Sequence, residues 1–283
     1  MTRLSQTGEI PGPHGATIRF EVQTPTQPRG RLPVVVVCHG FGVSKDWGFY
    51  PVLRAAVCDS GFTVVAFNYS HSGVLGDSTR IIDLERFRRN SLTMETIDLR
   101  IILNAIKSGA MPFASRCDSS RIGLIAHSRG ADSALEVAAT DSAVRAIVTL
   151  AAKSHLRTVT PDQELTWRQN KQWMVFNFET GGMLPLGTDL LEDLCRNRDR
   201  IENAVRRLEI PYLILHGEQD LWTSTQAART LASWAKHPTL AIIQDTGHSF
   251  DFESGVARLC SARSVTLAAI EEFLAKQFQC YGA

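Results

Sequence analysis

The stretch RIGLIAHSRGA (residues 121–131) places a serine between a buried apolar run and an alanine-rich helical pattern. A serine on a tight strand-to-helix turn is held in a strained backbone, with its hydroxyl above the sheet edge and the positive end of the helix dipole behind it. Strand and helix pass close together there, so small residues are needed two positions before and after the serine. Gly130 meets this need, and Ala126 replaces the more usual glycine. The pattern predicts that Ser128 is a nucleophile rather than a helix N-cap serine.

A second glycine turn lies earlier in the chain. The apolar run Leu32–Cys38 leads directly into His39-Gly40-Phe41-Gly42. Acyl transfer requires two backbone N–H groups aimed at the developing oxyanion, one from the residue after the nucleophile and one from the loop after an earlier strand. Alone, this motif is only a turn. Because it precedes the serine turn, we predict Phe41 and Arg129 as the oxyanion donors.

The two last strand-like runs each end in polar residues. His216-Gly217-Glu218-Gln219-Asp220 follows the first run, and Asp245-Thr246-Gly247-His248 follows the second. A serine needs an adjacent base, and the base needs an acceptor that fixes its tautomer. The chain order Ser, Asp, His agrees with this arrangement at one sheet edge, so we predict His248 as base and Asp220 as its acid. Three other acids compete with Asp220: Glu218, Asp245 and Asp251.

Short β-branched runs alternate with helical patterns along the chain, which is typical of a mostly parallel α/β sheet. The predicted strands are Ala16–Thr24, Leu32–Cys38, Phe62–Tyr69, Arg121–Ala126, Arg145–Leu150, Pro211–Leu215 and Leu240–Gln244. The predicted helices are Tyr50–Asp59, Thr93–Ser108, Gly130–Thr140, Ser224–Lys236 and Ser264–Phe278. A length of 283 residues fits one domain spanning residues 1–283 better than two domains.

The alternation is interrupted once, over Lys153–Leu208, where no strand pattern is visible. We interpret this segment as a mainly helical cap over Ser128 within the single domain. Its aromatic residues, with Trp222 beside the acid, suggest an apolar acyl or aryl pocket, although they could equally pack the cap onto the domain. The residues predicted to contact substrate are Trp167, Trp173, Phe176 and Trp222, and Phe178 lies in the same segment.

The composition excludes several classes of partner. Thirty basic and 29 acidic side chains give a net charge of +1, which provides no field for nucleic acid or an anionic membrane. The N-terminus has no signal-peptide pattern, and no apolar run reaches the ~20 residues of a membrane span. The six cysteines form no C-x-x-C pair, so we expect reduced thiols in a cytoplasmic protein and no zinc site, with a disulfide possible only after export.

Taken together, these motifs resemble the α/β-hydrolase superfamily, in particular its esterase and dienelactone-hydrolase-like branch. The resemblance runs from about Leu32 to Phe278, through VVVVCHGFG, FNYSHSG, RIGLIAHSRGA, YLILHGEQD and DTGHSF in family order. It implies an α/β-hydrolase fold and a triad of Ser128, Asp220 and His248, with no metal or other cofactor. The cap departs most from the family.

The expected activity is hydrolysis of a small, partly apolar or aromatic carboxylic ester through an acyl-enzyme on Ser128. A serine peptidase or amidase of prolyl-oligopeptidase-like type would use the same machinery. A catalytically silent ligand receptor on the same fold is the alternative outside enzymes, although a receptor has no need of all three triad residues. The sequence leaves the natural ester and the oligomeric state open.

Overall fold

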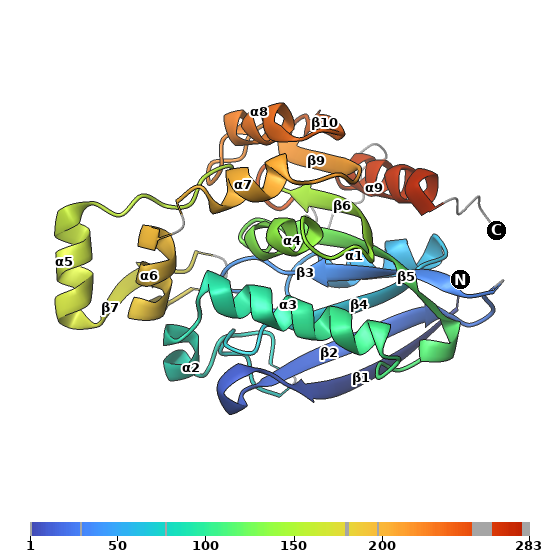
Figure 1. The fold of residues 1–283 in the computed structure, drawn as a ribbon, viewed down its shortest axis with the longest axis horizontal. Helices are drawn as coiled ribbons and strands as arrows, with labels where there is room; N and C mark the ends of the chain where they lie inside the picture. Colours follow the sequence, from blue (N-terminus) through green and yellow to red (C-terminus); the bar gives the residue numbers. More distant parts are fainter. Residues whose placement is uncertain are drawn as a thin grey trace.

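A mixed sheet forms the centre of the molecule (Figure 1). The computed structural model describes residues 2–28, 30–76, 78–178, 181–196, 198–250 and 262–278. Among these residues, eight strands pair in the order β1-β2-β4-β3-β5-β6-β9-β10. β1 and β2 are antiparallel additions at one edge, and the strands from β4 to β10 are parallel. The strands are β1 (Arg3–Pro11), β2 (Thr17–Pro25), β3 (Leu32–Cys38), β4 (Thr63–Asn68), β5 (Cys117–His127), β6 (Val144–Leu150), β9 (Tyr212–Gly217) and β10 (Pro238–Ile243).

Helices cover both faces of this sheet. Along β3, Val34, Val36 and Cys38 face the core shared with α3, α4, α7 and α8, whereas Val35 and Val37 face the core shared with α1 and α9. A strand covered on both faces is apolar at every position, as this one is. The helices of the two layers are α1 (Tyr50–Asp59), α3 (Leu92–Lys107), α4 (Gly130–Ala138), α7 (Arg200–Arg206), α8 (Thr225–Trp234) and α9 (Ala262–Phe278).

The predicted α/β-hydrolase fold is confirmed, and each of the seven predicted strands and five predicted helices is present with small shifts of its ends. β1 was not predicted, because its sequence is mostly polar and it is an exposed edge strand held by its pairing with β2. No helix among the described residues is long and apolar enough to cross a membrane.

The segment from α5 to α6, between β6 and β9, projects from one end of the sheet, at the left of Figure 1. It contains α5 (Pro161–Asn170), β7 (Gln172–Phe176), β8 (Met183–Gly187) and α6 (Thr188–Arg196). The expectation that it lacks strands was wrong, because β7 and β8 form an antiparallel hairpin. Both strands are short and, among the described residues, pair with each other alone, so they lack the long apolar run of a central strand. The short helix α2 (Leu84–Arg88) packs against β8.

The projecting segment has its own small core. Trp167 of α5 is only 1% exposed and packs with leucines of β8 and α6, together with Phe87 of α2. The later part of the predicted cap behaves differently, because α7 packs against α4 and α8 in the main helical layer. The element above the end of the sheet is therefore α5 to α6 rather than the whole of Lys153–Leu208.

Candidate active site

Ser128 lies between the end of β5 and the start of α4, in the left-handed region at φ 50°. This conformation is unfavourable for a residue with a side chain, and the turn is held by a hydrogen bond from the Ser128 N–H to the Leu150 carbonyl, at 2.8 Å. A Cβ atom on Gly130 would lie 2.5 Å from the His39 carbonyl oxygen and 2.8 Å from that of Cys38. The glycine is therefore required because α4 passes directly against the end of β3.

His248 and Asp220 form a hydrogen-bonded pair at the same end of the sheet. His248 Nδ1 donates to Asp220 Oδ2 at 2.7 Å, and the Asp220 carboxylate is fully buried. Its other oxygen, Oδ1, accepts from the backbone N–H groups of Trp222 and Thr223 at 2.8 and 3.0 Å. Burial opposes ionisation of Asp220, but hydrogen bonds from His216 and His248 outweigh it and hold its pKa well below the usual range. Asp220 is therefore a permanent acceptor that fixes the Nδ1–H tautomer of His248.

The competing acids are placed less favourably. Asp245 and Glu218 are exposed, and neither contacts His248 within the described part of the chain. Asp251 lies outside the described residues. Of the described acids, Asp220 is the one that reaches the imidazole.

The loop after β3 lies directly beside the serine turn. A Cβ atom on Gly40 would be 3.4 Å from the Ser128 Cβ. Within the described residues, the N–H groups of Phe41 and Arg129 donate to no protein acceptor. Both belong to residues that line the same cavity as Ser128 and His248. These two donors are available to an oxyanion.

His127, next to Ser128, connects three parts of the site. Its Nε2–H donates to the His248 carbonyl at 3.1 Å, so its Nδ1 must accept the Tyr50 O–H at 2.9 Å. The Tyr50 oxygen in turn accepts the Gly40 N–H at 2.8 Å. Burial, together with nearby His248, lowers the pKa of His127 to about 3, so the ring stays neutral and keeps this tautomer. Tyr50 was not predicted as part of the site, because it lies 77 residues from His127.

We expect Tyr50→Phe to lower the free energy of unfolding by about 1–3 kcal/mol, because it leaves the buried Gly40 N–H and His127 Nδ1 without partners. Urea denaturation at neutral pH measures this change. A decrease below about 0.5 kcal/mol, the usual effect of a surface substitution, would contradict the hydrogen-bond chain.

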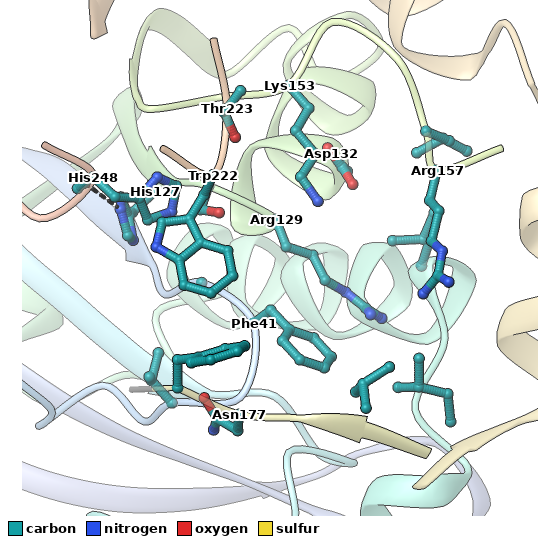
Figure 2. Close-up of a pocket in the computed structure, with 18 of the residues that line it drawn as sticks. Phe41, His127, Arg129, Asp132, Lys153, Arg157, Asn177, Trp222, Thr223 and His248 are labelled. Carbon is teal, nitrogen blue, oxygen red and sulfur yellow. Dashed lines mark hydrogen bonds between the residues drawn. The ribbon is translucent and has the colours of Figure 1, made fainter. Parts of the chain in front are cut away.

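A cavity of about 330 Å³ opens over Ser128 and His248 (Figure 2). Two of the four predicted substrate contacts, Phe176 and Trp222, line it. Trp167 and Trp173 do not: Trp167 lies inside the core of the projecting segment, and its ring packs 6.1 Å from that of Trp173. These two tryptophans therefore hold the segment together, which sequence alone could not distinguish from pocket lining.

The β7–β8 hairpin contacts both loops of the catalytic end. Asn177 Nδ2 donates to the Gly42 carbonyl at 2.7 Å, which joins the hairpin to the loop that carries Phe41. Phe178 packs 5.0 Å from Trp222 and 4.8 Å from Phe176, ring centre to ring centre. The three rings form an aromatic cluster on the cavity wall and join the hairpin to the Asp220 loop. Sequence reasoning missed Asn177, whose role depends on its tertiary contact.

Charged side chains also enter the cavity. Arg129, Asp132, Lys153 and Arg157 line it, and Figure 2 shows them on the side away from His248. Asp132 was detectable as the residue one helical turn after Ser128, and Lys153 as a residue just past the end of β6. Within the described residues, no group of three His, Cys, Asp or Glu side chains is arranged to hold a metal ion.

The family model for the alpha/beta hydrolase family matches residues 35–262. The chain belongs to the alpha/beta hydrolase family. Comparison of this hydrolase with curated proteins found no match. Its fold is similar to those of several solved structures, all distant in sequence.

The esterase domain of a Rhodothermus marinus protein is 16% identical, with a TM-score of 0.66 over 96% of this chain and 98% of that one. Est1E from Butyrivibrio proteoclasticus, solved with ferulic acid bound, is 17% identical, with a TM-score of 0.70 over 94% of this chain and 97% of its own. The alpha/beta hydrolase GrgF from Penicillium sp. sh18 is 16% identical, with a TM-score of 0.74 over 98% and 99%. At this level of identity the likeness concerns the fold.

Proposed function

We propose that this hydrolase cleaves carboxylic esters by the two-step mechanism of a serine hydrolase. The observation that carries the proposal is His248, which is paired with Asp220 at 2.7 Å and lines the same cavity as the strained Ser128. The esterase neighbours of the same fold support it further. The proposed substrate is a small ester with an apolar or aryl part, and the cytoplasm is the proposed compartment.

In the first step, His248 Nε2 takes the proton of the Ser128 hydroxyl while the oxygen attacks the ester carbonyl. The Phe41 and Arg129 N–H groups stabilise the oxyanion. As the carbonyl re-forms, the C–O bond to the alcohol breaks, and the alkoxide takes its proton from His248. Water, deprotonated by His248, then attacks the acyl-enzyme and releases the acid, and Ser128 regains its proton.

Labelling with a fluorophosphonate tests the proposal. We expect one adduct at Ser128, found by peptide mass spectrometry, and 4-nitrophenyl acetate hydrolysis that is lost in proportion to labelling. A protein that is neither labelled nor active on nitrophenyl or hydroxycinnamate esters would be a silent receptor instead. Cleavage of peptides or anilides with no ester hydrolysis would favour the peptidase alternative.

The aromatic cluster should select substrates by size. We expect Phe176→Ala to lower kcat/KM for a bulky aryl ester about 10- to 100-fold, mainly through KM, and to affect an acetyl ester much less. Met174→Ala is the control and should change neither value, because Met174 lies on the same strand, is exposed and does not line the cavity. Equal losses on both esters would assign Phe176 a packing role only.

A further inference from the structure

The acyl side of the cavity combines apolar walls with an excess of positive charge. Protonation of the leaving group by His248 places the alcohol half of an ester near His248. In Figure 2, Arg129 and Lys153 lie near the middle of the cavity and Arg157 at the side opposite His248, in the direction in which the acyl half would extend. Leu156, Leu190 and Leu194 line the cavity as well. An acyl group there passes along leucine side chains and meets cations.

The cations are only partly neutralised by the protein. The Arg129 Nε contacts Glu95 at 3.1 Å. Its guanidinium carbon lies over the Phe41 ring, 5.4 Å from the ring centre. The residue is only 8% exposed, and its Nη2 is buried without a hydrogen-bond partner. A buried guanidinium N–H without an acceptor costs free energy, so this atom is poised for an acceptor brought by a ligand.

Lys153 and Arg157 are also available. Within the described part of the chain, Lys153 forms no hydrogen bond or ion pair, and Arg157 has only a contact with the Trp173 ring, at 6.0 Å. Asp132 is 4% exposed, its Oδ1 has no partner, and burial raises its pKa to about 6 against the opposing effects of Lys153 and Arg129. Within the described part of the chain Asp132 forms no ion pair with these cations, so it leaves them only partly compensated.

The balance of charge favours a monoanion. Three cations, Arg129, Lys153 and Arg157, face at most two negative charges, on Asp132 and Glu95, which leaves at least one positive charge. Arg200, a further cation whose charge acts on Asp132, is already paired with Glu136. We propose that the acyl half of the substrate carries a terminal carboxylate, which Arg129, Lys153 and Arg157 bind beyond an apolar spacer. This inference rests on the proposed esterase function and adds the substrate class: monoesters of dicarboxylic acids.

The test compares 4-nitrophenyl monoadipate with 4-nitrophenyl hexanoate, which have acyl chains of equal length and the same leaving group. We expect kcat/KM to be at least about tenfold higher for the monoadipate, since a charge-assisted hydrogen bond contributes roughly this factor or more. The Lys153→Met, Arg157→Met double variant should lower the ratio of the two kcat/KM values at least about tenfold. Lys153→Arg should keep the wild-type ratio, as should Lys276→Met, an exposed lysine on α9.

The possible outcomes separate the two proposals. Hydrolysis of both esters with a ratio of one or less would overturn the carboxylate site and leave the esterase function standing. A high ratio that survives the double variant would overturn the assignment to Lys153 and Arg157. Hydrolysis of neither ester, with no fluorophosphonate adduct, would overturn the esterase function and this inference with it.

Discussion

Ser128→Ala is expected to reduce turnover of 4-nitrophenyl acetate on the order of 10⁶-fold, the loss seen when the nucleophile of a serine protease is removed. The variant should fold normally, because alanine keeps the backbone N–H that donates to Leu150 and removes only the hydroxyl. The N–H groups of Phe41 and Arg129 would remain, so a small residual rate over water is expected. Steady-state kinetics and fluorophosphonate mass spectrometry measure the effect.

Ser133→Ala is the matched control for that experiment. Ser133 is a fully buried serine on α4, the helix that follows Ser128; it is hydrogen-bonded to Tyr69 and to the Gly130 carbonyl and does not line the cavity. It should lose about 1 kcal/mol of stability and keep its turnover. If Ser128→Ala hydrolysed the ester at a rate near that of Ser133→Ala, Ser128 would not be the nucleophile.

Asp220→Asn should reduce kcat roughly 10⁴-fold, the effect of the same change in a serine protease triad. The geometry predicts the direction. The Trp222 and Thr223 N–H groups donate to Oδ1, so they would select the amide oxygen of asparagine for that position. The amide NH₂ would then face His248 Nδ1 in place of Oδ2. A donor at this point stabilises the tautomer with its proton on Nε2, which cannot accept the serine proton.

Asp245→Asn makes the same chemical change on an exposed residue three positions before His248. Asp245 has φ 55°, a conformation that asparagine adopts readily, so little strain is added. We expect activity within about twofold of the wild type, as for a surface substitution. A crippled Asp245→Asn with an active Asp220→Asn would move the acid to Asp245.

The candidate site was predictable where it depends on position along the sheet. Ser128, Asp220 and His248 follow parallel strands, whose carboxyl ends meet at one edge, so chain order and strand boundaries were enough to bring them together. Tyr50, Asn177 and the Arg129 side-chain contacts were not predictable in this way. They depend on which side chains meet across loops and helices far apart in sequence.

The aromatic residues of the projecting segment show the other limit. Trp167 and Phe176 lie only nine residues apart in the same segment, yet the first is enclosed in the segment's core and the second lines the cavity. A large aromatic ring is equally suited to stabilising a small core and to lining a pocket, so residue type does not distinguish the two roles. Only the direction of the chain at α5 and in the β7–β8 hairpin separates the two roles.

The hydrogen bond between Asn177 and the Gly42 carbonyl has a consequence for how this hydrolase can be altered. The β7–β8 hairpin, which forms part of the cavity wall, is joined by this bond to the loop that carries Phe41. A substrate large enough to displace this wall would also displace an oxyanion donor, so its turnover would fall as well as its affinity. Enlarging the pocket for a new substrate would therefore require changes that shorten side chains and leave this amide in place.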